Sequence, residues 1–78
     1  MTKIELKEKL DAAGISPESY SLNGGLFDEC HTLDGEGDKW SVYYSERGEK
    51  NALHYFQSEP AACQFFLERV LNDPTTRR

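Results

Sequence analysis

The sequence predicts an α+β domain: a four-stranded antiparallel sheet, connected as a meander, with N-terminal and C-terminal helices packed on one face. Three observations predict this fold. Apolar residues recur at helical spacing near both ends of the chain, four segments between them have strand character, and the links between these segments are short. Short links favour antiparallel neighbours, because parallel strands need a long crossover. With 78 residues, the chain has room for a single domain over residues 1–78.

The first helix is expected from about Thr2 to Ala13. Thr2 and Glu5 have the spacing of a capping box, in which each side chain satisfies an amide that the other residue exposes. Gly14 would end the helix, because glycine readily adopts the left-handed conformation of a C-cap. The stripe that would face the core consists of Leu6, Leu10 and Ala13, with Ile4 at its edge.

Strand character and turn residues alternate through the middle of the chain. The third strand is the clearest, because Trp40, Val42 and Tyr44 would face the core while Tyr43 faces outward with small polar neighbours. The glycine-rich loop 34–38 precedes this strand. The four strands are expected at Tyr20–Leu22, Phe27–Leu33, Lys39–Glu46 and Asn51–Gln57.

The last helix is expected from about Glu59 to Asn72. Ser58 is a natural N-cap, and Pro60 suits the first turn. Pro74 would stop the helix, so residues 74–78 are expected to be a frayed tail.

Charge is distributed unevenly along the chain, whose net charge is -5. No lysine or arginine lies between Lys9 and Lys39. This stretch holds seven acids, five of them in the predicted hairpin 28–38, where they would repel one another unless a positively charged partner met them. The same acidity argues against DNA or RNA as a direct partner, since phosphate groups need basic patches. The seven acids are Asp11, Glu18, Asp28, Glu29, Asp34, Glu36 and Asp38.

Catalytic and metal-binding patterns are weak. The alternating acids at 34, 36 and 38 resemble the start of a calcium loop, but Lys39 stands where that loop needs glycine. Cys30, His31, His54 and Cys63 lack paired zinc-ligand spacing, so the cysteines are interpreted as buried thiols without a disulfide and the histidines as surface residues. Cys30, the two histidines and Glu46 could in principle supply a nucleophile and a base, but no catalytic motif in the sequence supports such a site.

A four-stranded sheet of this size also leaves little room for a ligand pocket. We therefore expect no enzyme activity, no cofactor and no metal. The chain has no apolar run long enough for a membrane span and no apolar signal-peptide block, so we expect a cytoplasmic protein without membrane association.

Three segments carry a resemblance to a known class of proteins. They are Tyr20-Ser21-Leu22-Asn23-Gly24-Gly25, Trp40-Ser41-Val42-Tyr43-Tyr44-Ser45-Glu46-Arg47-Gly48 and Phe56-Gln57-Ser58-Glu59. Together they resemble small bacterial immunity proteins of polymorphic-toxin and contact-dependent growth-inhibition systems, over about residues 20–71. The resemblance implies a protein without catalytic residues that binds and blocks the C-terminal domain of a cognate toxin. Such toxins are often basic nucleases, which implies an acidic inhibitor.

The leading hypothesis is an immunity protein that binds a basic toxin domain, as a monomer or weak homodimer. A generic protein-binding adaptor or regulatory domain is the alternative. A small nucleic-acid-binding module that uses the aromatic third strand is a third possibility. The residues expected to contact the partner are Asp28, Glu29, Asp34, Glu36, Asp38, Tyr43, Glu46 and Arg47.

Overall fold

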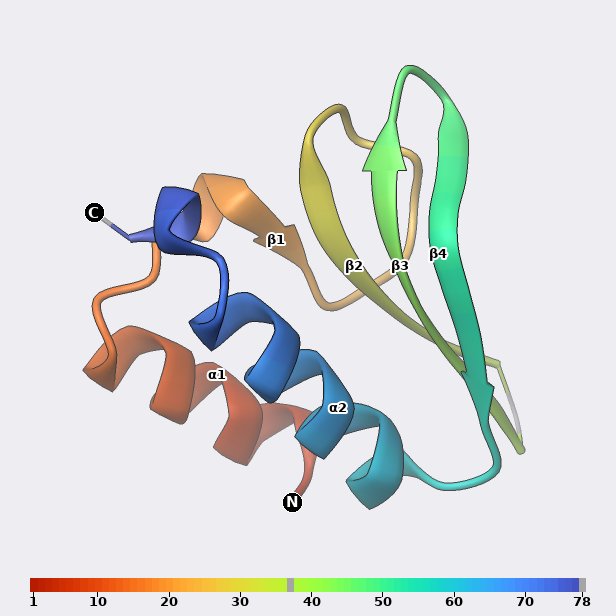
Figure 1. Ribbon diagram of the computed structural model, residues 1–78. Helices are drawn as coiled ribbons and strands as arrows, with labels where there is room; N and C mark the ends of the chain where they lie inside the picture. The colour runs from red at the N-terminus through yellow and green to blue at the C-terminus, as the bar shows by residue number, and fades with distance from the viewer. Residues whose placement is uncertain (37, 78) are drawn as a thin grey trace.

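The computed structural model describes residues 1–36 and 38–77, and the side chain of Glu36 lies outside that description. The fold is α+β, with two helices and a mixed four-stranded sheet in the order β1-β2-β3-β4 (Figure 1). Its elements are α1 (Lys3–Ala12), η1 (Pro17–Ser19), β1 (Tyr20–Ser21), β2 (Cys30–Glu36), β3 (Lys39–Glu46), β4 (Glu49–Phe56), α2 (Glu59–Leu71) and η2 (Pro74–Thr76).

The sheet is mixed, so the prediction of an entirely antiparallel meander is wrong. β2, β3 and β4 are antiparallel neighbours, but β1 runs parallel to β2, with Tyr20 opposite His31 and Ser21 opposite Thr32. The chain leaves β1, passes behind the sheet in the view of Figure 1 and returns to the starting end of β2. Because β1 has only two residues, the eight residues 22–29 are enough for this return.

The predicted helix caps are confirmed. The Thr2 side chain accepts a hydrogen bond from the Glu5 amide, and the Glu5 carboxylate accepts one from the Thr2 amide, which completes the capping box. Gly14 follows the helix with a φ of 74°, in the left-handed region. The Ser58 hydroxyl accepts a hydrogen bond from the Ala61 amide at the start of α2.

The main core lies between α2 and one face of the sheet. α2 contacts β2, β3 and β4, and α1 packs against α2 (Figure 1). Leu33 and Val42, on neighbouring strands, supply the sheet side of this core and are wholly buried. The buried cluster comprises Leu6, Leu10, Ile15, Tyr20, Leu33, Val42, Ala62, Cys63, Phe66 and Val70.

The opposite face of the sheet is covered in part, over β2 and β3, by the segment 22–29. The Tyr43 hydroxyl donates a hydrogen bond to the Gly25 carbonyl over 2.8 Å, and the Tyr43 side chain is 1% exposed. Thr32 and Ser45 are buried on the same face. The expectation that Tyr43 faces solvent and contacts a partner is therefore wrong. The side chains of β3 do alternate between the two faces of the sheet, but the segment 22–29 covers the face to which Tyr43 points.

The residues after α2 are held against the rest of the molecule. Thr76 is buried, its hydroxyl donates to the Val70 carbonyl, and its carbonyl accepts from the Ser16 amide over 2.7 Å. Arg77 forms an isolated antiparallel bridge with Ile15. The expectation of a frayed tail is therefore wrong for residues 74–77. The last residue of the predicted tail, Arg78, lies outside the described residues.

Candidate functional site: an acidic groove at one end of the sheet

Carboxylates from separate parts of the chain meet where β2 begins and β3 ends. Glu18 comes from η1, Asp28 and Glu29 precede β2, and Asp73 precedes η2. They line a groove with a volume of about 390 Å³, which we call the acidic groove. Its other lining residues are Ser16, Ser19, His31, Tyr44, Thr75, Thr76 and Arg77.

The acids beside β2 are positioned by the neighbouring hairpin turn. An Asp28 carboxylate oxygen (Oδ1) accepts a hydrogen bond from the Arg47 amide over 3.0 Å, which ties the start of β2 to the β3–β4 turn. Arg47 and Gly48 both have positive φ, as the central residues of a type I′ hairpin turn do. This turn ends the strand that carries Glu46, and therefore keeps a further carboxylate near the acidic groove.

His31 and Asp73 form an ion pair or hydrogen bond within the groove. His31 Nε2 lies 2.9 Å from Asp73 Oδ2, and the imidazole is edge-on to the Tyr44 ring at 5.0 Å between centroids. His31 is only 6% exposed, and its Nδ1 is buried with no hydrogen-bond partner in the described part of the chain. The interpretation of His31 as a surface histidine is therefore wrong, because η2 and the Tyr44 ring cover it.

Asp73 is held by several hydrogen bonds at the edge of the groove. Its Oδ1 accepts hydrogen bonds from the Thr75 hydroxyl over 2.7 Å and from the Thr75 amide over 3.0 Å. The hydrogen bond with the Thr75 hydroxyl and then the contact with His31 lower the pKa of Asp73 to about 2. Asp73 therefore carries its negative charge throughout the physiological pH range.

The Tyr44 phenol lies among the carboxylates of the groove. Burial raises the pKa of Tyr44 first, and the carboxylates of Glu29, Glu46 and Asp73 raise it further by disfavouring the phenolate. Arg77 brings a positive charge to the lining, and its guanidinium donates to the Leu71 carbonyl over 3.0 Å. Four carboxylates against one guanidinium make a groove whose chemistry suits the binding of cationic side chains.

The structure separates the predicted acidic hairpin into two ends. β2 has seven residues and is about 20 Å long, so Asp28 and Glu29 lie far from the turn that holds Asp38. Asp34 lies against Gly24 on the outer face of the sheet, where a Cβ on Gly24 would meet its carboxylate at 2.8 Å. Asp38 is exposed, and the side chain of Glu36 lies outside the described residues. Among the described residues, the acids of the predicted hairpin therefore do not lie in one cluster, and a role of Asp34, Glu36 and Asp38 in binding stays a prediction.

Two groove residues were missed or discounted by the sequence analysis. Glu18 was among the acids of the lysine-free stretch, but the expected partner surface did not include it. Asp73 lay between the predicted helix end and the predicted tail 74–78 and was given no role, although an aspartate directly before Pro74 is a signal for a capped turn. Only the three-dimensional fold shows that these residues meet Asp28 and Glu29.

The two cysteines are buried in separate elements of the fold. Cys30 and Cys63 are buried and free, and burial is the first cause that raises the pKa of each thiol. Among residues 1–36 and 38–77, no three His, Cys, Asp or Glu side chains are arranged to hold a metal ion. Over the same residues, no helix has the length and apolarity that crossing a bilayer requires.

Comparison of the chain with protein-family models, curated proteins and solved structures gives no match.

Proposed function

We propose that this protein binds a basic protein partner through the acidic groove, and that it acts as an immunity protein that neutralises a toxin domain. The acidic groove supports the binding of a basic protein. The resemblance of segments 20–25, 40–48 and 56–59 to immunity proteins supports the proposal that this partner is a toxin domain. The partner would be the C-terminal domain of a cognate toxin, with a nuclease as the leading candidate because nucleases need basic surfaces to hold phosphates.

The observation that carries the proposal is the convergence of carboxylates from three separate segments. Like charges brought together in a fold repel one another, and this repulsion lowers stability. Glu18, Asp28 and Glu29 are exposed, so their charges are available to a lysine or arginine of the partner. Such complementarity speeds association and selects partners of the right charge.

His31 is the buried residue of the groove. Its Nδ1 is a buried polar atom without a partner in the described residues, and such atoms are rare in folded proteins. Its Nε2 contacts Asp73, so His31 helps to hold one of the groove carboxylates in place.

Rescue of a host cell tests the proposal. Each candidate toxin domain encoded in the same genome region would be expressed alone, with the wild type, and with a Glu18→Lys/Glu29→Lys variant. We expect the wild type to restore growth and to co-purify with the domain at one-to-one stoichiometry. The variant should restore growth less well at equal expression. Co-purification without rescue would favour the adaptor alternative, and neither result with any neighbouring domain would refute the immunity proposal.

A further inference from the structure

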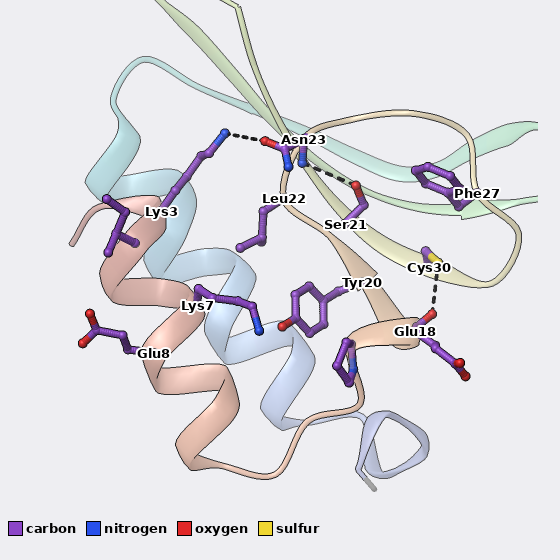
Figure 2. Close-up of a pocket in the computed structure, with 12 residues that line it drawn as sticks. Lys3, Lys7, Glu8, Glu18, Tyr20, Ser21, Leu22, Asn23, Phe27 and Cys30 are labelled. Carbon is purple, nitrogen blue, oxygen red and sulfur yellow. Dashed lines mark hydrogen bonds between the residues drawn. The ribbon is translucent and has the colours of Figure 1, made fainter.

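A second groove lies on the other side of η1, between α1 and the segment 17–27. Figure 2 shows it with its lining side chains, and its volume is about 770 Å³. This is within the size range of small-molecule sites, so the expectation that the fold leaves little room for a ligand is wrong. We call it the apolar groove.

The walls of the apolar groove are largely hydrocarbon. Tyr20 and Leu22, at and after β1, line it from the sheet side. Ile4 on α1 and Phe27 in the return segment also line it, and they are 74% and 60% exposed. Large apolar side chains this exposed around one concavity mark a place where apolar surface can be buried by something that binds.

Two lysines bring positive charge into these apolar surroundings. The Lys3 and Lys7 side chains reach from α1 across to the β1 segment (Figure 2). The Lys3 ammonium donates to the Asn23 amide oxygen over 3.0 Å, a neutral partner that does not compensate its charge. The Lys7 ammonium lies 5.8 Å from the centroid of the Tyr20 ring and also pairs with Asp11 over 2.6 Å.

The acids that line the apolar groove are directed elsewhere. The Glu8 and Glu18 side chains point away from Tyr20 and Leu22 in Figure 2. Of the two ammonium groups that face the apolar walls, Lys7 is already paired with Asp11, so Lys3 supplies the uncompensated charge. The combination of an apolar surface with this one ammonium group complements a molecule with an apolar body and one negative charge.

We propose that the apolar groove binds a small apolar molecule that carries a single carboxylate, of the type of a medium-chain fatty acid. Its hydrocarbon chain lies along Tyr20, Leu22 and Phe27, and its carboxylate pairs with the ammonium group of Lys3, whose partner in the structure is the neutral Asn23 amide. This site is separate from the acidic groove, although Glu18 contributes to the lining of both. The proposal does not rest on the proposed immunity function.

The test is a titration with sodium decanoate below its micelle concentration, followed by ¹H–¹⁵N NMR of the intact chain. We expect saturable shifts confined to α1 and residues 17–27. Decanol has the same chain without the charge, and we expect it to bind about tenfold more weakly. Equal binding of decanol and decanoate would overturn the proposal, because the lysines would then select nothing. Absence of saturable shifts with decanoate would overturn it as well.

Two matched lysine variants on α1 test which positive charge binds the carboxylate of decanoate. Lys3→Met should weaken decanoate binding about tenfold and leave decanol binding unchanged. Lys9→Met removes the same charge from an exposed position on the same helix that does not line the groove, so decanoate binding should stay within twofold of the wild type. Equal losses in both variants would show a long-range effect of net charge and would contradict a site at Lys3.

Discussion

At the scale of single residues, Asp73 connects the acidic groove to the stability of the protein. One carboxylate oxygen caps η2 through Thr75 and the other contacts buried His31, so this side chain joins the end of the chain to β2. Its folded-state pKa of about 2 is below the ordinary value of 3.8. A lowered carboxylate pKa means that the charged form stabilises the fold.

The Asp73→Asn variant tests this connection. Asparagine can still accept the hydrogen bond from the Thr75 amide, but it has no charge to offer His31. We expect the free energy of unfolding at pH 7 to fall by about 1 kcal/mol, after allowance for solvent screening of a partly exposed carboxylate. This contribution is present above about pH 4 and is lost as the pH falls towards 2, so the wild-type advantage should shrink over that interval.

Urea denaturation between pH 2 and pH 7 measures this difference. Asp38→Asn is the control, because it removes a carboxylate from an exposed turn at the other end of β2. A wild-type advantage over Asp73→Asn that does not change with pH would contradict the role of the charge.

Single residues also explain why only part of the candidate site could be predicted from the sequence. Asp28 and Glu29 were expected from the density of acids in the sequence, and they do line the groove. Asp73 and His31 could not be placed beside them, because the two residues are 42 positions apart and meet only through the docking of η2. A single sequence contains no signal for such a contact.

At the scale of elements, the return segment 22–29 is what the sequence analysis did not foresee. The ends of both helices were predicted to within one residue, because their caps and apolar spacing are local signals. The parallel pairing of β1 is not local: a two-residue strand carries almost no pattern, and its direction depends on where the following segment crosses. The same crossing buries Tyr43, which alternation alone placed at the surface.

The Tyr43→Phe variant measures what holds this segment in place. It removes the hydroxyl that donates to the Gly25 carbonyl and leaves the ring. We expect a loss of about 1 kcal/mol in the free energy of unfolding and faster amide hydrogen exchange in residues 22–29. Tyr55→Phe is the matched control, since Tyr55 is 72% exposed, and should change neither quantity. Unchanged exchange in Tyr43→Phe would show that other contacts hold the segment.

At the scale of the whole molecule, the fold sorts charge and apolar surface into separate places. The acidic groove lies at the end of the sheet where η1 and η2 meet, and the apolar groove lies along α1 on the other side of η1. The lysine-free stretch of the sequence is therefore not one surface. Asp28 and Glu29 lie at the start of β2 and Asp38 lies beyond its other end, and the acids that join with Asp73 are the ones we propose for partner binding.

The measurement that tests this claim most directly is the association rate of charge-reversed variants with the toxin domain identified by rescue, followed by stopped-flow fluorescence at low salt. Glu29→Lys and Asp38→Lys change the net charge equally, and both positions are exposed, but only Glu29 lines the acidic groove. We predict that Glu29→Lys slows association about tenfold, that Asp38→Lys changes it less than about twofold, and that the difference shrinks in high salt. Equal effects of the two variants, or a larger effect of Asp38→Lys, would contradict binding at the acidic groove.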